Sequence, residues 1–216
     1  MANILVYALH YDGAINKNSL GAVSEGAKLA AELGGEAHAI LLGENVPQDL
    51  AASLGSYGAK KVLVAEGPEG LAQPLVDAMA AAISGGDYSY ALFGGGLLGF
   101  EIGAGLAARL GAGVAMEVTA VRAEGGELVA ERPILGDSAI SEIKYRSDVG
   151  IIIGRLNAFE LKESGDGDAP VEKLAFELSP HASQATMLTR GEQRGADVDI
   201  GAALFSAREH RRLRGV

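Results

Sequence analysis

The feature that most constrains the fold is an alternation of short apolar runs with longer stretches whose apolar residues recur at helical spacing. Residues 3–9 and 36–42 are apolar runs of strand length. Residues 18–33 between them carry an apolar stripe that stops at Gly34 and Gly35. Glycines directly after such a stripe are typical of a helix end. Alternation of this kind predicts βαβ units and a mainly parallel sheet.

The same pattern continues to about residue 110. We predict further strands at 61–65 and 90–94, and helices at 47–54, 71–84 and 98–110. A strand that contains a run as apolar as residues 39–42 needs cover on both faces of the sheet. The predicted fold class is therefore α/β, a mainly parallel sheet with helices on both faces.

The second half of the chain is richer in strands than in helices. We predict strands at 114–122, 127–134, 139–145, 150–154 and 171–178. Gly125 and Gly126 mark a hairpin turn, and the polar stretch 163–170 marks a surface loop. Because antiparallel strands commonly join parallel sheets, we expect one continuous domain over residues 1–190. A linker or tail remnant over residues 191–216 completes the predicted organisation.

Composition excludes several classes of function. A formal net charge of -10 repels nucleic-acid phosphates and anionic membranes, so we expect no nucleic-acid binding. The chain has no cysteine, which excludes disulfides, thiolate catalysis and cysteine metal sites. No apolar run approaches the ~20 residues that span a bilayer. We therefore expect no membrane insertion and a cytoplasmic location, with the basic residues 208–214 in a solvated tail.

A glycine cluster is the main candidate binding site. Gly94, Gly95, Gly96 and Gly99 follow a predicted strand and open a predicted helix. Backbone N–H groups and a helix dipole at such a position can hold a phosphate or another anion. The cluster departs from G-x-G-x-x-G spacing, and no P-loop lysine follows it. A tight turn that lets the helix pack closely on the sheet explains the same glycines, and we favour that interpretation.

Residue types that carry acid-base, nucleophilic or metal chemistry are scattered along the chain. The four histidines are far apart, and none stands at metal-ligand spacing from another histidine or a carboxylate pair. No G-x-S-x-G elbow occurs. His10 follows the first predicted strand at a place where α/β sheets often carry ligands, although a turn residue with a solvated ring explains it better. We predict no catalytic residue and no metal site.

Two segments form a recognisable pattern. Residues 99–110 read GFEIGAGLAARL, and residues 132–140 read RPILGDSAI, followed by Arg155 shortly before an Ala-Phe pair. The first is similar to a helix of the type G-R-D-L-A-P-R-L-A-A-R-L, and the second to an R-P-I-Y-A/G-G-N-A-I segment. Both patterns, in this order and spacing, resemble the alpha subunit of electron-transfer flavoproteins. The resemblance covers roughly residues 1–190 as one fold-level unit.

The resemblance implies a Rossmann-type fold related to the adenine-nucleotide alpha-hydrolases, and electron carriage rather than substrate chemistry. The family's alpha subunit pairs with a beta-type subunit and accepts electrons from flavin dehydrogenases. It binds FAD mainly through a second domain, which carries an S-G-A-x-Q-H segment. That segment does not occur in this sequence. We therefore expect this chain alone to bind FAD weakly or not at all, with the FAD of the assembled complex held largely elsewhere.

The resemblance also bears on two arginines and on the interface. We expect Arg132 and Arg155 to be structural or interface residues, because an arginine beside a strand bonds carbonyls or carboxylates in a planar fork. We expect pairing with a beta-type subunit, or a homodimer, through residues 114–159. The apolar strand at 150–154 would be hard to leave solvated at a sheet edge. A covered central strand is the alternative explanation of that segment.

A stand-alone adenine-nucleotide-binding domain of the universal-stress type is the second functional hypothesis, with AMP as its ligand. That type carries G-x-x-G, then nine residues and G-S or G-T. Gly96 and Gly99 supply the first part, but Arg109 stands where the later glycine is expected. The signature is therefore incomplete.

Overall fold

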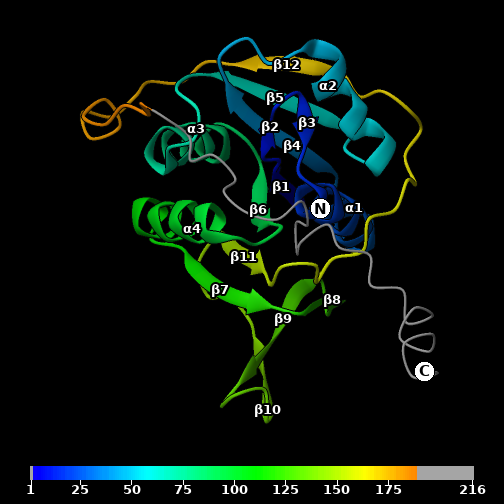
Figure 1. The fold of residues 1–216 in the computed structure, drawn as a ribbon. Helices are drawn as coiled ribbons and strands as arrows, with labels where there is room; N and C mark the ends of the chain where they lie inside the picture. The colour runs from blue at the N-terminus through cyan, green and yellow to red at the C-terminus, as the bar shows by residue number, and fades with distance from the viewer. Residues whose placement is uncertain (1, 189–216) are drawn as a thin grey trace, which may run out of the picture.

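The computed structural model describes residues 2–188, and β1 (Asn3–Tyr7) lies at the centre of its main sheet (Figure 1). Every strand pairing in this seven-stranded sheet is parallel. In spatial order the strands are β12 (Val171–Leu174), β5 (Lys61–Glu66), β4 (Ala37–Gly43), β1, β6 (Tyr88–Phe93), β11 (Gly150–Gly154) and β7 (Gly113–Val118). The predicted α/β class is confirmed.

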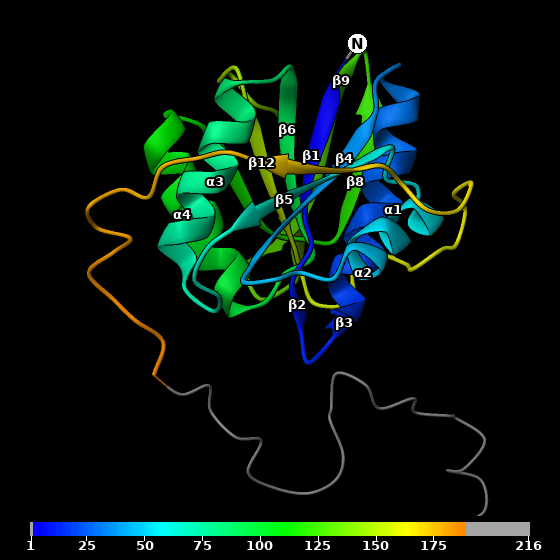
Figure 2. The same cartoon turned by 90° about the horizontal axis from the view of Figure 1, so that it is seen from above.

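Helices cover both faces of the sheet, as the continuous apolar strands required (Figure 2). One face packs against α1 (Lys17–Glu32), α2 (Gln48–Ala52) and a short 3-10 helix (Ser53–Tyr57). The other face packs against α3 (Ala72–Ser84) and α4 (Leu97–Leu110). Side chains of β1 alternate between the two cores because successive residues of a strand point to opposite faces.

The order in which the chain adds strands to the sheet reverses beside β1. It runs from β1 to β4 and β5 on one side, and then crosses to β6 on the other side. In open α/β sheets this reversal leaves a crevice at the carboxyl ends of the two diverging strands, and ligands bind there in many proteins. The carboxyl ends of β1 and β6 are therefore the first place to look for a site.

The antiparallel strands of the second half form a sheet of their own. It contains β8 (Ala120–Glu124), β9 (Glu127–Ile134) and β10 (Ala139–Ile143), and the β9–β10 hairpin projects away from the main sheet (Figure 1). The prediction that these strands would join the parallel sheet was wrong. The predicted strand at 114–122 is interrupted at Thr119, where the chain leaves β7 for β8. Glu117, with φ 58, turns the backbone just before that break.

The strand at 150–154 has the predicted bounds but lies inside the sheet. It pairs with β6 on one side and with β7 on the other, and all five of its residues are buried. The alternative explanation, a covered central strand, is therefore confirmed. The expectation that this strand lies at a sheet edge and needs a partner there was wrong. A further small hairpin joins β2 (His10–Tyr11) to β3 (Ala14–Ile15) ahead of α1.

Several sequence predictions concern the ends of the chain or the bilayer. The predicted tail at 191–216 and the basic residues 208–214 lie outside the described residues. Among residues 2–188, no helix has the length and apolar character needed to cross a membrane. The predicted loop at 163–170 is present and runs between β11 and β12.

Candidate functional site

The predicted glycine cluster lies in the crevice at the carboxyl ends of β1 and β6. Gly94, Gly95 and Gly96 form the turn from β6 into α4, and Gly99 is buried in the first turns of that helix. The crevice encloses about 120 Å³. Its other walls come from the end of β1, the start of α1 and Leu156 after β11. The cluster therefore follows a strand and opens a helix, as the sequence predicted, and it lies at the carboxyl ends of the parallel strands.

Close backbone contacts explain two of these glycines. A Cβ on Gly94 would overlap the backbone oxygen of Asn18 in α1. Gly95 has φ +91, and a Cβ there would overlap the backbone oxygen of Gly154 at the end of β11. The glycines thus let the turn pack between α1 and β11. This is the tight-turn interpretation that the sequence favoured.

The polar side chains around the crevice are used by the protein's own backbone. The Oδ1 of Asn16 accepts from the N–H of Asn18 at 2.9 Å and begins α1. The Oγ of Ser19 accepts from the N–H of Leu9 at 3.0 Å, and the Oδ1 of Asn18 accepts from the N–H of Asn157 at 2.7 Å. These bonds fix the walls of the crevice. The start of α4 has no side-chain cap, so its first amides are among the donors that a ligand in the crevice could use.

The space beside the crevice is filled by side chains. A neighbouring cavity over β1 and β4 has a volume of only about 10 Å³ and is lined by Leu9, Leu71 and Leu98, among others. Sites for small molecules and cofactors usually enclose about 300–1,000 Å³. With about 120 Å³, the crevice suits water or a small anion. It does not fit FAD.

His10 has a structural contact. Its Nε2–H donates to the carbonyl oxygen of Leu42 at 3.0 Å, which ties the β2–β3 hairpin to the end of β4. Within residues 2–188, no three His, Cys, Asp or Glu side chains are grouped so that they could hold a metal ion. His10 therefore does not take part in a metal cluster of the described chain.

Arg155 fastens three segments together directly after β11. Its Nε donates to Glu117 of β7 at 3.0 Å, and its two Nη atoms donate to the carboxylate of Asp137 at 3.2 and 3.1 Å. The bonds with Asp137 raise the pKa of Arg155, and they hold the pKa of Asp137 below its usual range. Asp137 lies in the turn between β9 and β10. Arg155 thus anchors the projecting hairpin to the main sheet.

Arg132 lies on β9, opposite Ser141 of β10. Its Nε is buried and finds no hydrogen-bond partner among the described residues. Arg155, in contrast, abuts the glycine turn, because a Cβ on Gly95 would come within 3.2 Å of the Arg155 carbonyl carbon. Of the two predicted arginines, the structure brings Arg155 to the glycine cluster.

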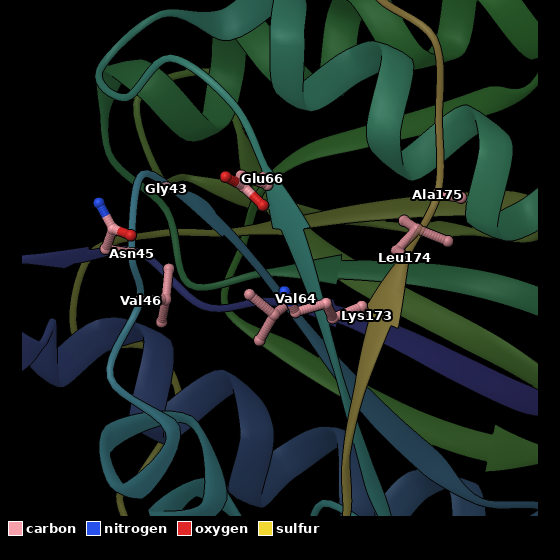
Figure 3. Close-up of a pocket in the computed structure, with 8 residues that line it drawn as sticks. All are labelled: Gly43, Asn45, Val46, Val64, Glu66, Lys173, Leu174 and Ala175. Atoms are coloured by element: carbon pink, nitrogen blue, oxygen red, sulfur yellow. The ribbon is translucent and has the colours of Figure 1, made fainter.

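A larger hollow, which the sequence did not indicate, opens at the carboxyl ends of β4, β5 and β12 (Figure 3). It has a volume of about 540 Å³, and its lining combines Val46, Val64 and Leu174 with Asn45, Glu66 and Lys173. The hollow depends on the pairing of β12 with β5, which are far apart in the sequence. The one local signal was Glu66, an exposed carboxylate at the end of an apolar strand.

Comparison with known proteins identifies the family. A family model described as "Electron transfer flavoprotein domain" matches residues 4–179. Protein FixB of Clostridium saccharobutylicum is 29% identical over 211 residues, which are 93% of this chain and 61% of the relative. Electron transfer flavoprotein subunit alpha of Clostridium acetobutylicum is 30% identical over 213 residues, which are 93% of this chain and 62% of the relative.

A shorter match is to a protein whose name also describes an electron transfer subunit. The acryloyl-CoA reductase electron transfer subunit beta of Anaerotignum propionicum is 40% identical over 67 residues, 31% of this chain and 18% of the relative. The chain spans about three fifths of the length of the FixB and alpha-subunit relatives. Except for Asn3 at the start of β1, the matched residues 4–179 include all seven strands of the main sheet and both helical layers. The chain therefore belongs to the electron transfer flavoprotein domain family.

Proposed function

We propose that this chain is the base domain of an electron-transfer flavoprotein of the alpha type, meaning the domain that docks a beta-type subunit while FAD is held largely elsewhere. In this role the chain takes part in electron carriage. The observation that carries the proposal is the family match over residues 4–179, because it coincides with the whole folded unit. The alpha-subunit name of the Clostridium acetobutylicum relative, which aligns with 93% of this chain, supports the alpha assignment. The role is electron transfer rather than substrate chemistry.

FAD in the assembled complex is held largely outside this domain. The crevice of about 120 Å³ supports this, because FAD needs a much larger formed pocket. The side-chain oxygens of Asn16, Asn18 and Ser19 already accept from backbone N–H groups, so they are less available as acceptors for a flavin. The alpha-subunit relative also extends well beyond the matched region, which leaves room for a flavin-binding part.

The family assignment supports the partners and the location that we propose. Flavin dehydrogenases deliver electrons to the complex, and the acryloyl-CoA reductase name of one relative supports coupling of such a domain to a redox enzyme. A beta-type subunit is the direct partner, with a homodimer as the alternative. The complex works in the cytoplasm. Arg132 and Arg155 serve the structure or the interface, and Arg155 supports this through its bonds to two other segments.

An AMP-binding domain of the universal-stress type has less support. Its one favourable observation is the position of Gly94–Gly99 at the reversal of strand order, where nucleotides bind in many α/β proteins. A volume of about 120 Å³ is too small for AMP without movement of Leu156 or the glycine turn. No lysine is among the described residues that line the crevice, so a phosphate would find no ammonium group there.

The test is the cofactor content of the purified chain. We expect no stoichiometric flavin in the absorbance spectrum, and no AMP in mass spectra of the material released on denaturation. The same measurements on the chain purified together with a beta-type subunit and a flavin-binding alpha-subunit domain should show flavin. About one flavin or one AMP per isolated chain would overturn the proposal.

A further inference from the structure

The hollow at the carboxyl ends of β4, β5 and β12 has the size and the position of a small-molecule site. Its volume of about 540 Å³ lies within the range of about 300–1,000 Å³ that such sites usually enclose. In open α/β sheets, ligands bind at the carboxyl ends of the parallel strands. The electron-transfer role proposed above does not use this hollow.

The strand register places a lysine and a glutamate on one face of the sheet in the hollow. Val64 of β5 is paired in register with Lys173 of β12, so the two side chains point to the same face. Glu66 is two residues after Val64 and points to that face as well. Neighbouring strands lie about 4.8 Å apart and two residues advance ~6.6 Å, so the Glu66 and Lys173 backbones are roughly 8 Å apart. Figure 3 shows the Lys173 side chain extending from β12 toward Val64.

These two charges are not used by the protein itself. Within residues 2–188, the side chains of Glu66 and Lys173 form no ion pair and no hydrogen bond, and both residues are exposed. On the opposite face of the same two strands, Lys61 and Glu172 stand in a similar diagonal relation and form an ion pair at 3.5 Å. The sheet therefore permits a diagonal ion pair between β5 and β12, but in the hollow it leaves one cation and one carboxylate available to a ligand.

Apolar side chains form the wall between these charges and the loop after β4. Val46 and Val64 are half-buried and pack against the core on one face of the sheet, and Leu174 is half-buried at the end of β12. Asn45, exposed in the loop, adds a side-chain amide that has no hydrogen bond within the described chain. The lining thus offers an ammonium group, a carboxylate, an amide and an apolar wall.

Other charged side chains lie near the hollow but outside its lining. A Cβ on Gly43 would be 2.5 Å from Oε1 of Glu69 and 3.0 Å from Nε2 of His10. Glu44, the next residue after Gly43, is exposed. Lys173 is the one cation in the lining that the structure describes. Carboxylates therefore predominate at the ends of β4 and β5, and the positive charge lies on the side of β12.

We propose that this hollow binds a free α-amino acid with an apolar side chain. The carboxylate of the ligand pairs with Lys173, its ammonium group pairs with Glu66, and its side chain lies against Val46 and Val64. A simple cation would leave Lys173 without a partner, and a simple anion would face Glu66 without compensation. A zwitterion satisfies both groups, and its two charges are close enough together to bridge a lysine and a glutamate that stand diagonally on neighbouring strands.

The experiment is calorimetric titration of the full chain with L-leucine and with L-phenylalanine. We expect saturable binding of one molecule per chain for at least one of these probes. Two analogues of leucine each lack one charge: 4-methylpentanoate lacks the ammonium group, and 3-methylbutylamine lacks the carboxylate. Each analogue should bind about tenfold or more weakly than leucine, because it leaves either Glu66 or Lys173 without its partner.

Variants assign the two charges. Glu66→Gln and Lys173→Gln should each weaken binding of the amino acid about tenfold or more, with little change in the thermal midpoint, because both residues are exposed. Lys61→Gln is the matched control, since it removes a lysine of the same strand pair from the opposite face, and it should bind as the parent does.

No saturable binding of either amino acid at millimolar concentration would overturn the proposal. Unchanged affinity in both glutamine variants of the hollow, or equal affinity for leucine and its two analogues, would overturn it as well. None of these results would affect the assignment as a base domain, because that assignment is tested by cofactor content and by binding of a beta-type subunit.

Discussion

The two Nη atoms of Arg155 donate to the two carboxylate oxygens of Asp137, at 3.2 and 3.1 Å. This planar pairing joins the end of the buried strand β11 to the turn of the projecting β9–β10 hairpin. Because both side chains are partly exposed, the ion pair contributes little to the free energy of unfolding. Its main effect is to fix the position of the hairpin turn. It fixes the hairpin turn, and with it Leu135, relative to the main sheet.

Replacing Arg155 by lysine should loosen the hairpin without unfolding the domain. A lysine keeps the charge but cannot form the paired bonds to Asp137 while also bonding Glu117. Amide hydrogen exchange should become faster in the turn between β9 and β10, with little change in the thermal midpoint. Arg146→Lys, at an exposed arginine outside the hairpin turn, is the matched control. Unchanged exchange in the turn would show that Arg155 does not fix it.

Gly95→Ala should destabilise the domain by about 3 kcal/mol, because it combines left-handed strain with a steric overlap. A Cβ at Gly95 would overlap the backbone oxygen of Gly154. Gly126 has a similar φ of +86, but a Cβ added there would meet nothing within 4 Å. Gly126→Ala therefore isolates the strain and should cost about 1 kcal/mol. Urea unfolding measures both. Equal losses would mean that packing against β11 does not require the glycine.

Asp77 holds the chain that follows β12. Its Oδ1 accepts from Nη2 of Arg109 at 2.7 Å, and its Oδ2 accepts from the N–H of Ser179 at 2.7 Å, with Asp77 only 4% exposed. Asp77→Asn should lower the free energy of unfolding by about 2 kcal/mol, because the new NH₂ group faces one of these donors. Glu124→Gln, at an exposed ion pair, should change it little. If the two variants unfold at the same urea concentration, the bonds of Asp77 to Arg109 and Ser179 do not stabilise the fold as we expect.

Burial, with a smaller effect from Glu172, raises the pKa of Tyr88 to about 12, from an ordinary value of about 10. A raised pKa in the folded state stabilises the fold below the unfolded value, and this contribution is lost as the pH rises through about 12. Between about pH 10 and 12, unfolding free energy should fall by on the order of 1 kcal/mol after allowing for solvent screening.

Tyr88→Phe is the control for this titration. It removes the phenol, which lies 2.8 Å from Nδ1 of His38, and with it the proton that the folded state retains. Denaturant unfolding at several pH values should therefore give a shallower alkaline decline in this variant than in the parent. An identical decline would assign the pH dependence to other groups.

Local patterns were sufficient for much of the fold. The strand at 150–154 has the predicted bounds because its apolar run is short and flanked by glycines, and the glycine turn before α4 lies where its spacing placed it. The separation of the antiparallel sheet could not be predicted from local patterns. The chain leaves the main sheet after a backbone turn at Glu117, and Arg155 holds the hairpin turn through bonds between residues far apart in the sequence. The hollow beside Lys173 likewise exists only because β12 pairs with β5.

The proposed pairing with a beta-type subunit is tested most directly by sedimentation velocity of this chain mixed with that subunit at micromolar concentration. We expect the two proteins to sediment together as a complex of one copy of each. We also expect the isolated chain to carry no stoichiometric flavin in the same runs, recorded in the flavin absorbance band. Two separately sedimenting proteins, or a flavin-loaded isolated chain, would contradict the assignment of this chain as the base domain of an electron-transfer flavoprotein.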